Sequence, residues 1–127
     1  MAAAAATGPV TRAKAAGGIR LGNLYFSSGL TGVRPEARKD PLAFGGDIKE
    51  QTKRILELHK ANLESMGSSL ENVLKVTVFL ADLKDYDRMN AVYRSYDWGM
   101  VPPVRTTTSA AGVPGNSLVE IDVIAYI

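Results

Sequence analysis

The sequence predicts an α+β protein in which two helices cover one face of a single mixed β-sheet. Two stretches with helical spacing of apolar residues, 47–67 and about 82–96, alternate with runs rich in β-branched residues. The longest runs, 73–80 and 118–127, show the two-residue alternation of strands whose two faces differ. The predicted order is strand, strand, loop, helix, strand, helix, strand, strand, with both helices on one side of the sheet.

Composition limits the class of protein. The chain has 127 residues, 46% of them hydrophobic, which is enough for one domain with its own core. It has no cysteine, which excludes disulfides, thiolate metal sites and cysteine nucleophiles. The net charge is +2 without a long run of like charges, so we expect no nucleic-acid partner. No apolar run approaches the ~20 residues of a membrane span, and we expect a cytoplasmic protein without a membrane partner.

The amino-terminal part is expected to contain a tail, a hairpin and a loop. We expect residues 1–127 to form one domain, of which the alanine-rich residues 1–11 are a flexible tail; targeting to an organelle is left open. Residues 18–28 hold two short apolar runs separated by Gly22-Asn23, the turn of a two-residue hairpin. After a break at Gly29, residues 31–44 contain two prolines and many charges and are expected to form a loop.

Asp47 is expected to begin the first helix, because it stands three residues before Glu50 in the spacing of a capping box. Apolar positions then recur at steps of three and four as far as Met66, and Gly67 ends the helix. His59 lies on this inward stripe, where a lone histidine is more often a buried structural residue than a ligand. It is the only histidine of the chain, so we expect no metal site.

The next elements are a strand, a helix, a strand and a turn. In the strand expected at residues 73–80, alternation places four residues on the helix-covered face: Leu74, Val76, Val78 and Leu80. The second helix begins near Asp82 or Asp85, runs through Tyr96, and has five residues on its inward stripe: Tyr86, Met89, Val92, Tyr93 and Tyr96. Residues 104–110 then form a strand and residues 112–115 a turn.

The last strand, 118–127, has two different faces. One face is wholly apolar and consists of Val119, Ile121, Val123, Ala125 and Ile127. The other face carries Glu120 and Asp122 together with Ile124 and Tyr126. The sheet face that the helices leave uncovered would therefore hold Phe79, Ile124 and Tyr126, which indicates a partner subunit.

Two charged residues in the last strands are candidates for chemistry. Alternation puts Arg105 on one face of its strand with Thr107 and Ser109, where its guanidinium could bind a carboxylate through two hydrogen bonds. The alternative is a structural arginine at the strand edge, paired with Glu120 or Asp122. Glu120 interrupts an apolar strand and could orient a water or transfer a proton; the alternative is a solvent-facing residue of a half-buried strand. The residues by themselves predict an oligomeric α+β protein with an Arg/Glu site for an anion.

Several short stretches occur in an order and at a spacing that are specific when taken together. They are GNLYFSSG (22–29), Asp47-Ile48, Gln51-Thr52, Asn62-Leu63, VTVFL (76–80), Asp82-Leu83, MNAVY (89–93), PVRTT (103–107) and Val119-Glu120-Ile121. On these stretches the chain from about Gly18 to Ile127 resembles the Rid (reactive intermediate deaminase, YjgF-type) family.

The resemblance implies a chorismate-mutase-like fold and a homotrimer whose sheets form a central barrel, with ligands in three clefts between subunits. It also implies hydrolysis of reactive 2-imino and 2-enamino acids, such as 2-aminoacrylate and 2-iminobutanoate, to a 2-keto acid and ammonia, without cofactor or metal. By the same resemblance Arg105 would hold the substrate carboxylate and Glu120 would orient the attacking water. Gly29, Thr107 and Asn90 would complete the substrate-binding site.

Two positions depart from the family pattern. The tyrosine that the family's deaminases carry before the first strand falls on Ala15, and the cysteine usual two places after the arginine is Thr107. The missing phenol favours a different or bulkier substrate. The alternative function is a non-catalytic member of the same family that binds small carboxylates or a protein partner. Relatives have also been described as ribonucleases, which one histidine and a small net charge support little.

Overall fold

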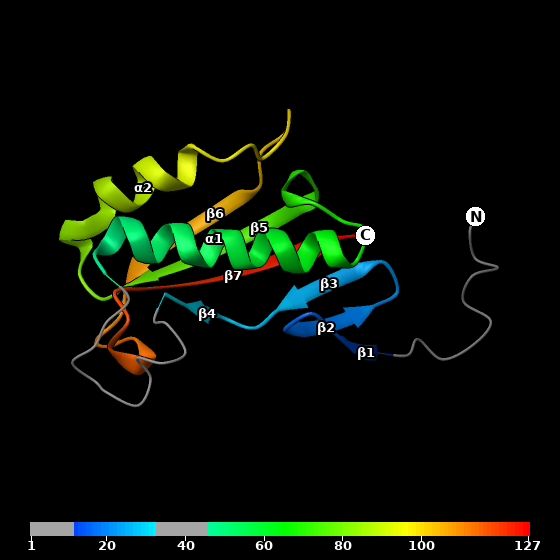
Figure 1. The fold of residues 1–127 in the computed structure, drawn as a ribbon, viewed down its shortest axis with the longest axis horizontal. Helices are drawn as coiled ribbons and strands as arrows, with labels where there is room; N and C mark the ends of the chain where they lie inside the picture. The colour runs from blue at the N-terminus through cyan, green and yellow to red at the C-terminus, as the bar shows by residue number, and fades with distance from the viewer. Residues whose placement is uncertain (1–11, 33–45) are drawn as a thin grey trace.

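A seven-stranded mixed sheet with two helices is the architecture of the protein. The computed structural model describes residues 12–32 and 46–127 (Figure 1). The sheet has the order β1-β2-β3-β7-β5-β6, with β4 beside β7, and within these residues only the β5–β6 pair is parallel. The elements are β1 (Arg12–Ala15), β2 (Gly18–Leu21), β3 (Leu24–Ser27), β4 (Leu30–Thr31), α1 (Ile48–Ser65), β5 (Val73–Leu80), α2 (Tyr86–Arg94), β6 (Val104–Ser109) and β7 (Val119–Tyr126). The predicted fold class is confirmed.

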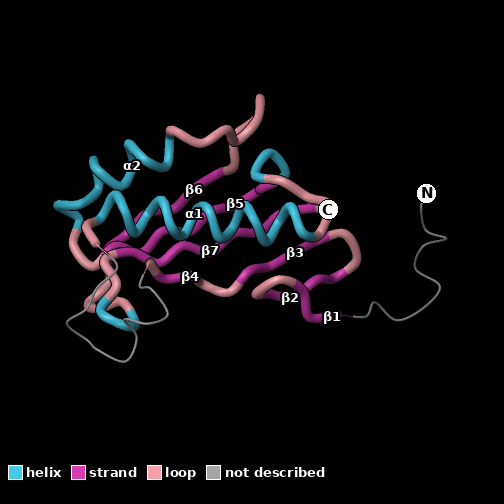
Figure 2. Tube along the Cα trace, viewed as in Figure 1, coloured by secondary structure: helices cyan, strands magenta, loops and turns pink. Residues whose placement is uncertain are grey.

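Helix α1 lies along the sheet and α2 runs beside it, as Figures 1 and 2 show. The side chain of Asp47 accepts a hydrogen bond of 2.9 Å from the Glu50 amide, so the predicted cap begins the helix. The chain leaves the helix at Met66 and turns at Gly67, whose φ of 77° favours glycine. The predicted start and end of α1 are therefore confirmed.

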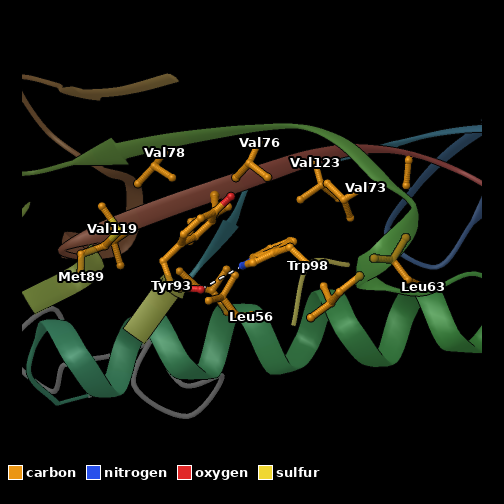
Figure 3. Packing of buried hydrophobic residues seen from close by; sticks show 14 of the residues in the cluster. Leu56, Leu63, Val73, Val76, Val78, Met89, Tyr93, Trp98, Val119 and Val123 are labelled. Atoms are coloured by element: carbon orange, nitrogen blue, oxygen red, sulfur yellow. Dashed lines mark hydrogen bonds between the residues drawn. The ribbon is translucent and has the colours of Figure 1, made fainter. Parts of the chain in front are cut away.

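The core lies between the helices and one face of the sheet (Figure 3). Strand β7 contributes the apolar alternation that its sequence predicts, with Val119, Ile121, Val123 and Ala125 at most 1% exposed. Helix α1 contributes Ile55, Leu56 and Leu63, and α2 contributes Met89 and Tyr93. Because both helices bury their apolar residues in this one cluster, both cover the same face of the sheet.

Some details of the strands differ from the prediction. The Gly22-Asn23 hairpin is confirmed, but β1 and β4 were not predicted, because four- and two-residue strands carry little pattern of their own. The placement of Leu74 on the buried face is wrong. The register of β5 with β7 shifts between Val73 and Lys75. As a result Leu74 is 46% exposed, and the side chain of Val73 lies in the core instead.

The second helix is shorter than predicted. It begins at Tyr86 after a 3₁₀ turn over Leu83–Asp85, and it ends at Arg94 rather than Tyr96. The predicted tail, residues 1–11, and most of the predicted loop, residues 33–44, lie outside the described residues.

The sheet face opposite the helices carries partly exposed apolar side chains. Ile19, Phe26 and Ile124 follow one another across β2, β3 and β7 in the pairing register. Ile19 and Phe26 are 38% and 39% exposed, and Tyr126 on the same face is 41% exposed. This apolar face agrees with the expectation that a partner covers it.

A buried glutamine joins the segment before α1 to the segment before β7. Gln51 is 0% exposed, donates to the Gly46 carbonyl over 2.9 Å, and accepts hydrogen bonds from the Ser117 hydroxyl (3.0 Å) and the Leu118 amide (2.9 Å). The Gly32 amide in turn donates to Ser117. The Gln51 side chain thus provides hydrogen-bond partners for backbone groups of two loops that are distant in sequence. It thereby holds in place the segment that leads into β7.

Gln51→Leu should lower the free energy of unfolding by about 2–4 kcal/mol, because each buried polar group left without a partner costs about 1–3 kcal/mol. Urea unfolding measures the loss. The matched control is Lys53→Leu, an exposed position of the same helix, which should change stability by less than about 0.5 kcal/mol. Equal stability of the two variants would show that the network contributes nothing.

Candidate active site

Strand β6 forms an edge of the described sheet and presents Arg105 toward the helices. In the parallel register with β5, Arg105 lies opposite Val76 and Thr107 opposite Val78. Val76 and Val78 are fully buried under the helices, so Arg105 and Thr107 are on that same face. The predicted alternation of this strand is confirmed.

Helix α2 holds the guanidinium with three side chains at positions i, i+4 and i+7. Arg105 donates from Nη1 to Oδ1 of Asn90 (2.7 Å) and from Nη2 to the hydroxyl of Tyr86 (2.8 Å). Its Cζ atom lies 4.5 Å from the centre of the Tyr93 ring, a cation–π contact. Trp98 in turn stacks on Tyr93 at 4.7 Å and donates from Nε1 to the Tyr93 carbonyl. The guanidinium is therefore fixed in position.

All of these partners are uncharged. Burial raises the pKa of the Tyr93 phenol, and the Arg105 charge only partly opposes this, so Tyr93 stays neutral. Between the described residues the ion pairs are Lys84–Asp82 and Arg88–Asp85, and neither includes Arg105. The alternative in which Arg105 pairs with Glu120 or Asp122 is therefore wrong.

The guanidinium retains the capacity to bind an anion. Two of its five N–H donors are used by Tyr86 and Asn90, and its charge is not matched by a carboxylate from the described part of the chain. The hydroxyl of Thr107, two residues further along the same face, is buried and makes no hydrogen bond within the described structure. Arg105 and Thr107 together offer donors to a small anionic ligand.

Glu120 lies on the other face of the sheet. In β7 it pairs with Phe79 of β5 and with Thr31 of β4, on the face that the helices leave uncovered. Its carboxylate lies against Gly29, where an added Cβ would stand 2.5 Å from Oε2, so a side chain at position 29 would displace the carboxylate. A hollow of about 170 Å³ adjoins Glu120 and is lined otherwise by Phe79, Ala110, Gly112, Val113 and Pro114.

The structure thus brings the predicted site residues together in two groups. Asn90, Arg105 and Thr107 form one group on the helix-covered face, and Gly29 and Glu120 form the other on the uncovered face. Sequence reasoning placed Tyr86 and Tyr93 in the core and did not connect them with Arg105. Tyr86, Asn90 and Tyr93 are spaced so that they lie on one face of a helix, and this spacing was visible in the sequence. That this face contacts Arg105 becomes clear only from the packing of α2 against β6.

His59 is buried, as predicted for a structural residue. Its side chain is 0% exposed, and Nε2 lies 2.8 Å from the Ile121 carbonyl of β7. Burial lowers the pKa of the imidazole below its usual 6.5, which the Ile121 hydrogen bond and the negative charge of Asp122 partly offset. Nowhere in ranges 12–32 and 46–127 do three or more His, Asp or Glu side chains meet as a metal-binding group.

Comparison with known proteins gives consistent matches over most of the chain. The profile of the family described as Endoribonuclease L-PSP matches residues 6–127. A RutC family protein of Pyrococcus abyssi is 44% identical over 108 residues, which cover 85% of this chain and 82% of that protein. Reactive Intermediate Deaminase A, chloroplastic, of Arabidopsis thaliana is 34% identical over 125 residues, covering 98% of this chain and 62% of that protein.

Among solved structures, E. coli TdcF with bound serine superimposes with a TM-score of 0.76 at 30% identity, covering 96% of this chain and 91% of that chain. In the described part of the structure, no helix has the length and apolar character needed to cross a membrane.

Lowering the pH from about 7.5 to about 5.5 should reduce the free energy of unfolding through His59. The unfolded chain takes up a proton near the usual pKa of 6.5, whereas the buried ring in the folded chain has a lower pKa and stays neutral. The unfolded state then binds more protons, so stability rises with pH in this window. His59→Gln keeps a donor near Ile121 but does not titrate. Urea unfolding of both proteins across this range should show a shallower pH dependence for the variant; parallel curves would contradict the assignment.

Proposed function

This chain belongs to the Rid (reactive intermediate deaminase, YjgF-type) family, and from that premise we propose that it hydrolyses reactive 2-imino and 2-enamino acids to a 2-keto acid and ammonia. The observation that carries the proposal is the Arg105 guanidinium, which is fixed by neutral partners and keeps free donors for a carboxylate. The name of the Arabidopsis relative and the serine bound by TdcF agree with a small amino-acid-like ligand.

The chemistry requires little more than positioning and one proton relay. Arg105 holds the substrate carboxylate, and Thr107 and Gly29 contact the reacting end. An enamine first gains a proton at C3 and loses one from nitrogen, which gives the imine. Glu120 then accepts a proton from water as the water oxygen adds to the C=N carbon, and it returns that proton to nitrogen. In the resulting carbinolamine the hydroxyl proton moves to nitrogen as the C–N bond breaks, so ammonia leaves, the C=O bond of the 2-keto acid forms, and no cofactor is consumed.

The two groups of site residues act together only if two copies of the chain meet. Arg105 and Glu120 project from opposite faces of one sheet, so a single chain cannot bring both to one substrate. We therefore include in the proposal a homotrimer, whose clefts combine Asn90, Arg105 and Thr107 of one copy with Gly29 and Glu120 of the next. The apolar face of β2, β3 and β7 supports such an assembly. A cytoplasmic location remains part of the same proposal.

The second candidate function is binding without turnover. Tyr86, Asn90 and Tyr93 hold Arg105 without any contribution from Glu120 of the same chain. A protein with this site alone would bind small 2-keto acids and release them unchanged.

Ribonuclease activity has less support, although the family profile carries that name. The chain has one histidine, and its imidazole is buried with one nitrogen at the Ile121 carbonyl. A histidine-based cleavage of RNA therefore has no accessible base in this chain.

Arg105→Ala should reduce keto acid release from 2-aminoacrylate at least about a hundredfold, because two charge-assisted hydrogen bonds to the substrate are lost. Serine dehydratase supplies the substrate, and keto acid formation is followed after the uncatalysed rate is subtracted. Arg105→Lys keeps the charge but loses the two-pronged geometry and should fall between wild type and Arg105→Ala. Arg94→Ala, an exposed arginine of α2, is the matched control and should retain the wild-type rate.

Equal rates for wild type and Arg105→Ala would contradict the proposal. Calorimetry with 2-ketobutyrate distinguishes the second candidate. Binding that depends on Arg105, in a protein that does not accelerate hydrolysis, would favour the non-catalytic function.

A further inference from the structure

The connection between α2 and β6 turns one large side chain into the core. Trp98 is buried, whereas Met100 and Val101, which follow it closely, are exposed. The Gly99 amide donates to Oδ1 of Asp97 over 2.9 Å, and Gly99 has a φ of 85°, so the chain makes a tight turn around Trp98. An indole is thus fixed at the point where the chain leaves α2 for β6.

The indole contacts Tyr93 in two ways. Its ring stacks on the Tyr93 ring, with the centroids 4.7 Å apart and the planes inclined by 25°. Its Nε1 donates to the Tyr93 carbonyl over 2.9 Å (Figure 3). Tyr93 lies in the last turn of α2, where carbonyls lack partners within the helix, and the Tyr96 amide reaches this carbonyl only over 3.4 Å. Trp98 therefore restrains both the ring and the backbone of Tyr93.

Tyr93 in turn restrains the plane of the Arg105 guanidinium. Asn90 and Tyr86 accept hydrogen bonds from Nη1 and Nη2, which hold two corners of the planar group. Two such bonds alone still allow the plane to tilt about the line that joins the two nitrogens. The Tyr93 ring, whose centre lies 4.5 Å from Cζ, opposes this tilt. A carboxylate held through two hydrogen bonds shares the guanidinium plane, so a tilt would also move the ligand.

We propose that Trp98 is a positioning residue, which acts through Tyr93 to set the plane of the Arg105 guanidinium and thereby the direction of the bound carboxylate. The charge of Arg105 does not depend on the indole, so loss of Trp98 should weaken binding little. It should slow the reaction more, because the C=N carbon is then misplaced relative to the group that adds water. The consequence for the rate rests on the hydrolysis proposed above, whereas the orientation of Arg105 does not.

The kinetic test replaces the indole in two steps. Trp98→Leu removes the stack and the N–H donor, and kcat for keto acid release from 2-aminoacrylate should fall about tenfold, with KM changed less than about threefold. Trp98→Phe keeps a stacking ring and should restore most of kcat. Ile48→Ala, which removes buried apolar volume from the first turn of α1, is the matched control for lost stability. It should lower the midpoint of urea unfolding and keep the wild-type kcat.

A double-mutant cycle separates positioning from stability. The two-pronged geometry is already lost in Arg105→Lys, so adding Trp98→Leu to that variant should lower kcat by less than about twofold. A merely structural role would lower kcat by the same factor in both backgrounds, and that result would overturn the proposal.

The side-chain signals of Arg105 supply a readout that needs no turnover. In wild type the contacts with Asn90, Tyr86 and Tyr93 should slow the rotation of the guanidinium. Nitrogen–proton correlation spectra should then show separate Nη signals, which are assigned by their loss in Arg105→Lys. These signals should merge in Trp98→Leu and stay separate in Trp98→Phe and Ile48→Ala.

The two readouts distinguish failure of the inference from failure of the proposed function. A wild-type protein that does not hydrolyse 2-aminoacrylate, but whose separate Nη signals merge in Trp98→Leu, would contradict the proposed function and keep the assignment of Trp98. Nη signals that stay separate in Trp98→Leu would overturn the assignment of Trp98, whatever the rate of hydrolysis.

Discussion

The pairing of β5 with its two neighbours is the constraint on which the site depends. Its parallel register with β6 puts Arg105 opposite the buried Val76, and its antiparallel register with β7 puts Glu120 opposite Phe79 on the other face. A shift of one residue in either pairing would exchange the faces, because side chains alternate along a strand. The same register that buries the core therefore separates the arginine from the carboxylate within one chain, and this separation is the reason that the proposed site combines two copies.

The surroundings of Arg105 explain how a folded chain can keep a cation ready for a ligand. A carboxylate partner would hold the guanidinium but would also compete with the substrate. Tyr86, Asn90 and Tyr93 instead hold it through a hydroxyl, an amide oxygen and an aromatic ring. These contacts restrict the side chain and leave its charge available. The stacking of Trp98 on Tyr93 extends the support into the core, so the position of the cation is linked to the packing of α2.

Local signals in the sequence were sufficient for most of the elements and for the faces of β7. The Asp47 cap, the Gly67 end and the Gly22-Asn23 turn each depend on neighbouring residues only, and each is found in the structure. The bulge at Leu74 and the short strands β1 and β4 depend on pairing with distant strands, which no local pattern shows. The partners of Arg105 could not be predicted for the same reason, since Asn90 and Tyr86 reach it across the contact between α2 and β6.

Co-assembly of two single variants tests most directly whether Arg105 and Glu120 from different copies form one site. Arg105→Ala and Glu120→Gln chains, each inactive alone, are mixed in equal amounts, unfolded and refolded together, with a mixture that is not unfolded as the control. A cyclic trimer assembled at random restores one site in each mixed trimer, so activity should return to roughly a quarter of the wild-type value. Refolded mixtures that contain mixed trimers but remain as inactive as the parent variants would contradict the account.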